Sequence, residues 1–439
     1  MNIAEKVREA GVVGAGGGGF PAHVKLAAKA EFVIANGAEC EPLLHKDAAV
    51  MEHAAAQVVR GMQVSMEATG AREGIVGIKA KNKHAVEAME AACKGTAVRV
   101  HLLGDYYPAG DEYDLVYETT GRLIPPAGIP IQVGAVVNNV ETLINIAAAQ
   151  DGRPVTDKWV TLAGALNHPV TLRVPVGLTY REVIEATGGF ACPDPVLVLG
   201  GLMMGQTSTN LDEVISKNSG GAVVLPRSHK TMERKLTPPK AQAAIGKSAC
   251  DQCRYCTEFC PRFLLGYDVQ PHAVMRSLGF TSTGSAHWNQ FASLCCSCGL
   301  CTLFACPEGL FPKEACDDSK TAMRAANQKW TGPPVTRTHP MRDGRRVPIK
   351  ALMKRLGILD YDHPAHFEEY KGVPRRAQVA LKQGAGAPCV ARVKAGDAVA
   401  AAQKIGEVPE GALGAPVHAP FAGRVETVTD KHIVITRTA

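Results

Sequence analysis

The sequence predicts an α/β protein built from several domains. Its 439 residues suggest about three domains, at the usual size of roughly 150 residues each. Aromatic residues make up only 5% of the chain and glycine is abundant, which favours α/β layers and tight loops over an aromatic-rich β-sandwich. Up to about residue 150, helical stretches alternate with short apolar runs, the pattern of a parallel sheet covered by helices.

The first part of the chain supplies the elements of this parallel sheet. Residues 2–10 predict a short helix with Ile3 and Val7 on one face. Strands are expected at three apolar runs, residues 31–36, 74–78 and 98–103.

The rest of the chain changes character several times. Short β-rich runs at 159–162 and 170–174 precede a turn at Gly188-Gly189 and a second glycine-rich piece at 196–205, whose methionines are expected to pack. A charged stretch at 227–246 predicts a linker, and the last residues predict another small β unit. The domain limits expected from these changes are 1–150, 151–230, 231–330, 331–376 for a basic linker, and 377–439.

A glycine-rich loop and two amides are candidates for ligand binding. Four consecutive glycines, Gly16 to Gly19, precede a helical stretch, so backbone N–H groups can approach an anion closely and the helix dipole favours it. A phosphate or a flat ring is the expected guest, and the alternative is a flexible loop. Asn138 and Asn139 precede another helix, where they either contact a flavin or cap the helix.

The cysteines carry the strongest signal. Nine of the 14 cysteines lie between Cys250 and Cys306, in two tandem runs that each end in Cys-Pro. The first run is Cys250-x2-Cys253-x2-Cys256-x3-Cys260-Pro261, and the second is Cys295-x2-Cys298-x2-Cys301-x4-Cys306-Pro307. Two-residue gaps let one loop deliver three thiolates, so the runs predict two [4Fe-4S] clusters and an electron-transfer protein. Zinc sites favour paired knuckles, and disulfide frameworks belong to short secreted chains.

The ligand sets follow from the exchange of the fourth cysteine seen in two-cluster ferredoxins. By that rule Cys250, Cys253, Cys256 and Cys306 hold one cluster, and Cys295, Cys298, Cys301 and Cys260 hold the other. Two points stay open: Cys296 competes with Cys295, although spacing favours Cys295, and the x4 gap departs from the usual x3. The other cysteines are expected to be buried small hydrophobic residues, namely Cys93, Cys192, Cys316 and Cys389, while Cys40 lies inside a ligand-binding motif. Cluster thiolates imply a reducing compartment.

Charge and hydropathy exclude other classes of protein. The net charge of +6 is spread along the chain, so no nucleic-acid binding is expected. No apolar stretch reaches 18 residues and no signal peptide is evident, which predicts a soluble protein without direct membrane insertion. A basic run at 329–376 predicts a solvated face or, alternatively, a docking surface.

Several motifs resemble one family of flavoproteins. The segment Gly14-x-Gly16-Gly17-x-Gly19-Phe20-Pro21-x3-Lys25 resembles the flavin loop of the FMN-binding subunit of respiratory NADH dehydrogenase and of Rnf complex C subunits. Three further motifs match in the same order: Asn36-x2-Glu39-x-Glu41-Pro42, Tyr107-x2-Gly110-Asp111-Glu112 and Asn138-Asn139-x-Glu141-Thr142. The middle of the chain resembles the β-grasp (SLBB-type) domain that follows the flavin domain in both, and Gly200–Gly205 is similar to the Gly-Gly-Pro-Met-Met-Gly of Rnf-type subunits, with Leu202 replacing Pro.

The resemblance implies a set of site residues. FMN would be held by Gly14, Gly16, Gly17, Gly19, Phe20, Lys25, Asn36, Tyr107, Gly110, Asn138, Asn139 and Thr142. Glu41, Asp111 and Glu112 would face the nicotinamide nucleotide as the catalytic residues. Ala38 stands where the respiratory subunit has Asp, which implies a loosely held FMN, and Asp111 replaces a Glu.

The order of domains narrows the resemblance. The tail resembles a barrel-sandwich hybrid, which Rnf C subunits carry at the N-terminus, and its C-terminal position is similar to that in cobalamin reductases of propanediol-utilisation microcompartments. Residues 407–413 replace the hairpin that would present a modified lysine, so no swinging arm is expected. The resemblance implies NADH-dependent reduction of cobalamin through FMN and two [4Fe-4S] clusters. Its implied partners are an adenosyltransferase that holds cobalamin and microcompartment shell proteins, and its implied location is cytoplasmic, inside a microcompartment.

Two other functions compete. One is an Rnf C-like NADH:acceptor subunit that serves ferredoxin or a membrane complex. The other is a scaffold that has lost flavin, against which the intact glycine loop argues. The residues do not name the electron acceptor or the oligomeric state, nor do they say whether residues 1–11 act as a targeting helix.

Overall fold

The computed structural model describes residues 1–279 and 290–438, and its first unit is a parallel sheet of four strands. The strand order is β3-β2-β1-β5, with every neighbouring pair parallel. The strands are β1 (Phe32–Gly37), β2 (Glu73–Lys79), β3 (Val98–Leu103) and β5 (Ala135–Asn139). The expected parallel sheet is therefore present, with strands close to the predicted residues.

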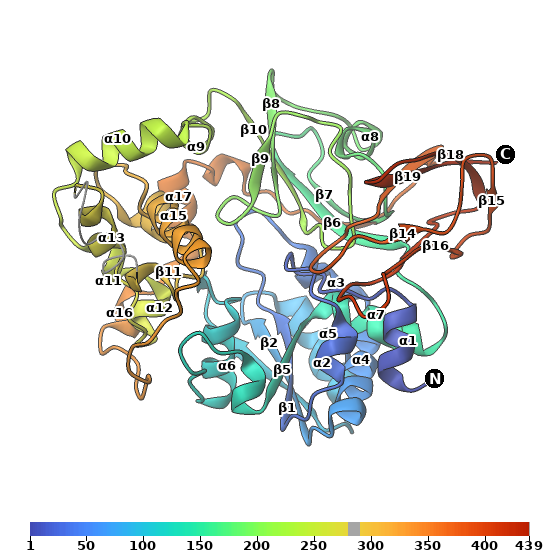
Figure 1. Ribbon diagram of the computed structural model, residues 1–439, viewed down its shortest axis with the longest axis horizontal. Coiled ribbons are helices and arrows are strands. Elements are labelled where there is room, and N and C mark those ends of the chain that lie inside the picture. The colour runs from blue at the N-terminus through green and yellow to red at the C-terminus, as the bar shows by residue number, and fades with distance from the viewer. Residues whose placement is uncertain (280–289, 439) are drawn as a thin grey trace.

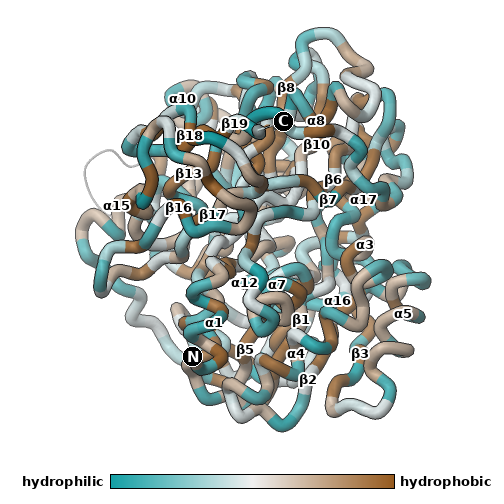
Figure 2. The backbone as a smooth tube through the Cα atoms, turned by 90° about the vertical axis from the view of Figure 1, so that its right-hand side faces the viewer, coloured by the Kyte–Doolittle hydropathy of each residue, from teal (hydrophilic) through white to brown (hydrophobic). Residues whose placement is uncertain are grey.

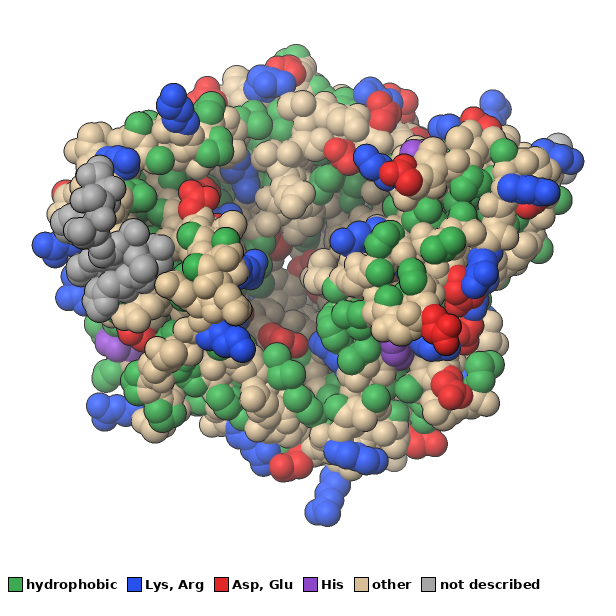
Figure 3. All heavy atoms as spheres, viewed as in Figure 1, with side chains coloured by type: hydrophobic (Ala, Val, Ile, Leu, Met, Phe, Trp, Pro, Cys, Tyr) green, Lys and Arg blue, Asp and Glu red, His purple; other side chains and the backbone are tan. Residues whose placement is uncertain are grey.

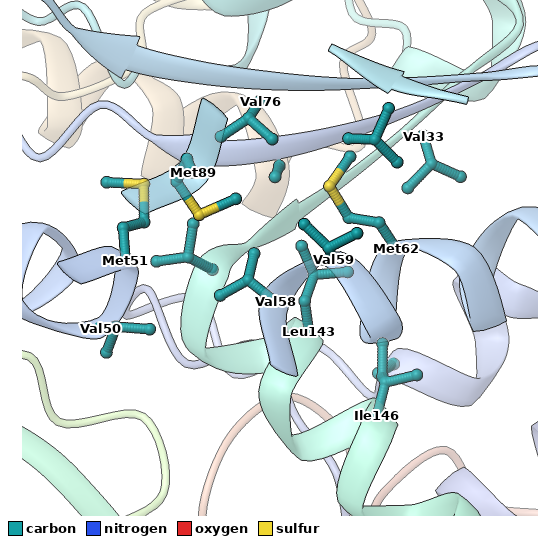
Figure 4. Close-up of a cluster of buried hydrophobic side chains, with 14 of the residues drawn as sticks. Val33, Val50, Met51, Val58, Val59, Met62, Val76, Met89, Leu143 and Ile146 are labelled. Atoms are coloured by element: carbon teal, nitrogen blue, oxygen red, sulfur yellow. The ribbon is translucent and has the colours of Figure 1, made fainter. Parts of the chain in front are cut away.

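Helices cover both faces of this sheet. Successive side chains of a strand point to opposite faces, so Val33 joins one apolar core and Ile34 the other. In Figure 4, Met62 and Val59 of α4 lie between the strands and Leu143 of α7. The larger core involves α1 (Ile3–Glu9), α2 (Ala22–Leu26), α3 (Lys46–His53), α4 (Ala55–Thr69), α5 (Lys83–Cys93) and α7 (Val140–Gln150); the other involves β4 (Tyr106–Tyr107), α6 (Glu112–Thr120) and η1 (Pro130–Val133).

A second sheet has six strands in the order β12-β7-β6-β10-β8-β9. The central strands β6 and β10 are parallel, whereas β6-β7, β10-β8 and β8-β9 are antiparallel. A buried face of α8 packs on this sheet. The elements are β6 (Asp157–Gly164), β7 (Val170–Pro175), α8 (Tyr180–Ala186), β8 (Pro195–Leu199), β9 (Gln206–Ser208), β10 (Gly221–Pro226) and β12 (Phe367–Glu369).

The cysteine runs lie among short helices. The charged stretch expected to be a linker is helical over much of its length. The elements here are α9 (Lys230–Lys235), α10 (Pro239–Ala249), α11 (Tyr255–Glu258), α12 (Pro261–Leu264), α13 (Pro271–Ser277), η2 (Gln290–Ala292), η3 (Cys301–Ala305) and α15 (Pro312–Ala325).

The basic run corrects an expectation. Arg342 is 8% exposed and forms ion pairs with Asp114 (2.6 Å) and Glu118 (2.5 Å) of α6. The guanidinium group of Arg342 also lies over the ring of Tyr117. This part of the run is neither a solvated face nor a docking surface, because the charge of Arg342 is paired with carboxylates inside the molecule.

The same segment forms strand pairs with both preceding units. It contains α16 (Arg342–Arg345), β11 (Val347–Pro348), α17 (Ile349–Leu356) and η4 (Leu359–Tyr361) before β12. Strand β11 pairs with β4 of the first unit, and β12 pairs with β7 of the second. The basic segment therefore fastens the units to one another.

The C-terminal unit consists of two small antiparallel sheets around one core. It lies beside α1, as Figures 1 and 2 show from two directions. Its strands are β13 (Arg376–Ala380), β14 (Val390–Ala391), β15 (Ala398–Val399), β16 (Lys404–Glu407), β17 (Val417–His418), β18 (Gly423–Val428) and β19 (His432–Arg437). Within residues 1–279 and 290–438, none of the helices combines the length and apolar character needed to cross a bilayer.

Candidate functional site

A large cavity lies at the carboxyl ends of β1 and β5. The chain continues from β1 to β2 on one side and returns to β5 on the other, so this is the switch point where open parallel sheets bind ligands. The cavity has a volume of about 880 Å³. Figure 3 shows the molecule hollowed at its centre. The predicted residues that line the cavity are Gly14, Gly16, Gly17, Gly19, Phe20, Lys25, Asn36, Glu41, Gly110, Asp111, Glu112, Asn138, Asn139 and Thr142.

The glycine loop presents free backbone donors to this cavity. The N–H groups of Gly14 and Gly19 close the loop on its own carbonyls, bonding to Phe20 and Gly14. The N–H groups of Gly16, Gly17 and Gly18 donate to no acceptor within the residues that the structure describes. Unpaired backbone N–H groups at a loop are suited to an anion such as a phosphate.

The two amides of β5 have different roles. Asn139 caps α7, because its Oδ1 accepts from the N–H of Glu141 (3.1 Å), and its Nδ2 donates to Asp47 (2.9 Å). Asn138 is 4% exposed, and its Nδ2 has no partner among the described residues. A buried donor that faces the cavity without an acceptor fits a bound cofactor that supplies one. Capping therefore explains Asn139, and ligand binding fits Asn138.

Glu41 holds a loop of the second sheet. Its two carboxylate oxygens accept the N–H groups of Met203 (2.8 Å) and Met204 (2.9 Å). A Cβ on Gly201 would lie 2.5 Å from Glu41 Oε2, so this approach requires glycine. Burial raises the pKa of Glu41 to about 7, and this effect outweighs the backbone hydrogen bonds from Met203 and Met204, which lower the pKa. Glu41 lines the cavity, but its carboxylate is already engaged by protein.

Asp111 and Glu112 are also paired. Asp111 accepts a hydrogen bond from Arg262 at 2.8 Å, and Arg262 follows the first cysteine run directly. Glu112 lies 3.5 Å from Lys25 Nζ, which donates to the carbonyl of Val137 at 2.7 Å. These carboxylates thus link the cavity wall to the cysteine runs and to the sheet.

Tyr107 does not line the cavity, although the family pattern places it around the flavin. It is 1% exposed and its hydroxyl donates to the carbonyl of Cys298 at 2.7 Å. Its neighbour Gly110 does line the cavity, where Asn36 Nδ2 donates to the Gly110 carbonyl at 3.0 Å.

Three further charged residues of the cavity were not among the predicted site residues, although Glu39 belongs to one of the family motifs. They are Glu39, Lys46 and Asp47, and Lys46 is only 2% exposed. Burial and the nearby Asp47 raise the pKa of Glu39 to about 8. The carboxylate of Glu39 accepts the N–H of Asp47 at 2.7 Å. For Lys46 and Asp47 the sequence signal is weak, because they are two opposite charges at the start of a helix that also ends in Glu52 and His53.

The first predicted cluster ligands share one pocket. It is lined by Cys250, Cys253, Cys256 and Cys306, the set expected from the exchanged fourth cysteine. Burial and the neighbouring thiols raise the pKa of Cys256 to about 12 in the protein alone. No group of three or more His, Cys, Asp or Glu side chains in the described part of the chain is arranged around one metal ion. The four thiolates of a cluster bind different iron atoms, so the pocket is compatible with a cluster.

Both cysteine runs have the same backbone pattern. Gln252 and Arg254 flank Cys253 with φ of 61° and 68°, while Ser297 and Gly299 flank the next central cysteine with φ of 57° and 82°. Left-handed residues alternating with right-handed ones turn successive N–H groups inward, a concavity found at many iron-sulfur sites. Gln252, Arg254 and Ser297 are not glycines, so this conformation is strained at each of them and must be offset by interactions elsewhere in the fold. Both loops therefore fit an anionic cluster.

This repeat bears on the choice between Cys295 and Cys296. Cys253 and Cys298 each lie between two residues of positive φ, so the two runs can be aligned on them. In this alignment Cys295 corresponds to Cys250, whereas Cys296 corresponds to Asp251 and not to a cysteine. The match supports the predicted Cys295.

The longer gap before Cys306 has a structural cause. Residues Cys301–Ala305 form a π-helix, which accommodates one residue more than an α-helical turn. Cys306 then follows in extended conformation, with Pro307 after it. The π-helix thus accommodates the extra residue of the x4 gap.

The second group of thiols touches the cavity of the glycine loop. Cys296 and Cys298 line that cavity, while Cys260 and Cys301 are buried. Cys316, expected to be a small hydrophobic residue, is fully buried next to Cys295. This contact lowers the pKa of Cys295 to about 7.

Comparison with protein families divides the chain in the same way. Residues 7–148 match the Nuo51 FMN-binding domain, residues 249–311 a 4Fe-4S dicluster domain, and residues 368–438 the RnfC barrel sandwich hybrid domain. The structure thus combines an α/β flavin domain, a dicluster domain and a C-terminal barrel-sandwich domain, as predicted. The chain is a flavin and iron-sulfur oxidoreductase.

Similar proteins share the whole chain or part of it. Cobalamin reductase PduS of Salmonella typhimurium is 41% identical over 436 residues, 99% of this chain and 96% of that protein. PduS of Citrobacter freundii is 40% identical and covers 100% of this chain and 97% of its own length. The C subunit of the proton-translocating ferredoxin:NAD(+) oxidoreductase complex of Clostridium ljungdahlii is 38% identical over 59% of this chain and 55% of its own length.

A solved structure shares the fold. A chain of the NAD+-reducing [NiFe]-hydrogenase in the H2-reduced state matches with a TM-score of 0.50 and 21% identity, covering 74% of this chain and 62% of that chain. The similarity over the full length is to the PduS proteins, at levels that establish common descent. The chain belongs to the PduS cobalamin reductase family.

Proposed function

We propose that this protein uses NADH to reduce the cobalt of cobalamin, with FMN and two [4Fe-4S] clusters as its cofactors. The proposal is supported by the full-length similarity to two proteins named cobalamin reductase and by the cavity and thiols described above. A bound flavin accepts a hydride and passes on single electrons, which clusters carry further. The residues proposed to hold these groups are those of the cavity and the two cysteine sets.

The chain's own groups supply binding, orientation and exclusion of water. The free N–H groups of Gly16 to Gly18 would bind the phosphate, and Asn138 would donate to the isoalloxazine ring. Glu41 closes one wall by holding the Met203–Met204 backbone. We infer that Glu41 positions this wall, and that Asp111 and Glu112 face the nicotinamide nucleotide.

The observation that carries the proposal is the sharing of one cavity by the glycine loop and two cysteines. Cys296 and Cys298 line it, whereas Cys250, Cys253, Cys256 and Cys306 line a separate pocket at which Cys253 is exposed. Between the two groups, the Cys256 thiol is near enough to Cys301 to help raise the pKa of the buried Cys301 thiol, after burial and Cys295. This order supports entry of electrons at the cavity and exit near Cys253.

Replacing one thiolate separates the two halves of the reaction. In Cys253→Ala, NADH should still bleach the flavin, because the cavity does not involve this residue. Reduction of cobalamin should fall steeply, while acceptors that react directly with flavin stay active. The control is Cys192→Ala, which replaces a cysteine in the unit of the second sheet and should keep both activities. Undiminished cobalamin reduction in Cys253→Ala would contradict the proposed route.

The acceptor distinguishes this function from its rival. Similarity to the ferredoxin:NAD(+) oxidoreductase complex favours an NADH:ferredoxin role as the second candidate. Wild-type protein that reduces ferredoxin but not cobalamin, even with an adenosyltransferase present, would establish that alternative.

We further infer the context and the domain limits. The middle unit, residues 151–230, is proposed to be an SLBB-type β-grasp domain, which is supported by its hairpin, helix and parallel central strands. An adenosyltransferase that holds cobalamin is the proposed partner, inside a propanediol-utilisation microcompartment with its shell proteins. Co-purification with such a compartment tests the location.

A further inference from the structure

The glycine loop is held by parts of the chain outside the flavin domain. Three alternate carbonyl groups of the loop each accept a hydrogen bond from another unit. These bonds join Lys158 Nζ to Ala15 O (3.2 Å), Asn218 Nδ2 to Gly17 O (3.2 Å) and the N–H of Ala385 to Gly19 O (2.9 Å). Two of the donors come from the unit of the second sheet, and the third comes from the C-terminal unit.

Fixing these carbonyls also fixes the amides that follow them. A trans peptide is planar, so its C=O and the next N–H point in opposite directions. Bonds to the carbonyls of Ala15 and Gly17 therefore turn the N–H groups of Gly16 and Gly18 away from those donors. Both amides are unpaired among the described residues, and both glycines line the cavity.

We propose that Lys158 and Asn218 are positioning residues that orient the amides of Gly16 and Gly18 for the FMN phosphate, and that the turn at Gly384–Ala385 holds the end of the same loop through the Gly19 carbonyl. The C-terminal barrel-sandwich unit is then a part of the flavin site, although none of its described residues lines the cavity. This inference rests on the proposed binding of FMN at the loop.

The contact between Gly19 and Gly384 is close enough to exclude any side chain. A Cβ on Gly384 would lie 2.2 Å from the carbonyl oxygen of Gly19, and a Cβ on Gly19 would lie 2.5 Å from Gly384 Cα. Both glycines have positive φ, 60° and 144°. The C-terminal unit therefore meets the loop through backbone, which makes the loop's position sensitive to one methyl group.

Lys217 fastens the same three units next to this contact. Its Nζ donates to the carbonyls of Gly11 (2.9 Å) and Pro416 (2.7 Å). Its own N–H donates to Gln383 Oε1 at 2.9 Å, directly before Gly384. The start of the flavin loop, the second unit and the C-terminal unit are thus joined at one buried side chain, which holds the turn against the loop.

Two matched pairs of variants test the proposal. Gly384→Ala disturbs the Gly19 carbonyl, while Gly386→Ala places a Cβ 2.1 Å from Leu413 O inside the C-terminal unit. Both positions have positive φ, so backbone strain is common to the pair. Asn218→Leu removes the donor to Gly17, while Asn167→Leu removes a donor to Gly188 O (2.8 Å) within the second unit.

The measurement is the Kd of the full-length protein for FMN and for riboflavin, which lacks the phosphate, by flavin fluorescence quenching. Gly384→Ala and Asn218→Leu should each weaken FMN about tenfold and leave riboflavin unchanged, because the loss acts through hydrogen bonds to phosphate. Both controls should keep the wild-type ratio of the two affinities.

Two results would overturn the inference. One is an unchanged FMN affinity in both test variants; the other is an equal loss of FMN and riboflavin, which would indicate general damage to the cavity. If Gly384→Ala does not fold, Asn218→Leu alone decides between these outcomes. Wild-type protein that binds no FMN would instead contradict the proposed function.

Discussion

The hydroxyl of Tyr107 donates a hydrogen bond of 2.7 Å to the carbonyl oxygen of Cys298. Tyr107 belongs to β4 of the flavin unit, and Cys298 is the central cysteine of the second run. Both residues are buried, at 1% and 7% exposure. The bond therefore sets the distance between the flavin unit and a thiol that lines its cavity.

Tyr107→Phe should weaken this connection without removing either site. The buried Cys298 carbonyl loses its donor, which should lower the free energy of unfolding by about 1–3 kcal/mol. Urea unfolding measures this loss, and the reduction potential of the adjacent cluster should shift. Tyr180→Phe removes a tyrosine hydrogen bond of the second unit, to Gly221 O at 3.4 Å, and should leave that potential unchanged. Equal potentials in both variants and wild type would contradict the connection.

Arg342→Ala should be strongly destabilising. It leaves the buried Asp114 without its cation, and removing one partner of a buried pair costs about 3–5 kcal/mol. Arg345→Ala is the control, because its pair with Glu258 is about one third exposed and should contribute less than about 1 kcal/mol. The urea unfolding midpoints of the two variants are compared, and similar midpoints would show that the ion pairs of Arg342 do not stabilise the fold more than the exposed pair of Arg345.

Lys217 should make stability depend on pH. Burial lowers its pKa to about 7, with Cys389 as the opposing influence, and no described carboxylate forms an ion pair with it. Unfolded lysine keeps its proton up to about pH 10, so between these values the unfolded state binds more protons and the free energy of unfolding rises with pH.

Comparison with Lys217→Met isolates this effect. The stability of wild type relative to Lys217→Met should increase by about 2 kcal/mol between pH 7 and pH 9. Lys94→Met, at an exposed position, should show no such change. A constant difference between wild type and Lys217→Met would mean that Lys217 keeps its proton in the folded protein.

Cys295 and Cys296 should differ in their effect on iron content. Reconstituted wild type should bind about eight iron atoms, since two clusters each take four thiolates and four irons. Cys295→Ser should fall to about four, while Cys296→Ser should retain about eight, because the backbone repeat pairs Cys295 with Cys250. Iron and sulfide analysis gives the answer, and the reverse result would assign the ligand to Cys296.

The sequence by itself determined the features that depend on short spacings. The Cys-x2-Cys-x2-Cys runs specify loops because the residues between the thiols are too few for any other path, and the structure gathers Cys250, Cys253 and Cys256 at one pocket. The strands of the parallel sheet were equally predictable, since Val33 and Ile34 must point to opposite, buried faces. The glycine run likewise predicted a cavity lined by backbone.

Tertiary structure decided which partners these local features meet. Asn218 reaches the Gly17 carbonyl across 201 residues of sequence, and no local pattern encodes such a contact. The sequence places Arg342 in a basic run that predicts a surface, whereas packing buries it beside Asp114. Tyr107 matched a flavin motif, yet the approach of the second cysteine run gave its hydroxyl the Cys298 carbonyl as acceptor. A short motif fixes backbone shape and residue type, whereas the acceptor for a buried donor depends on which distant segment fills the remaining space.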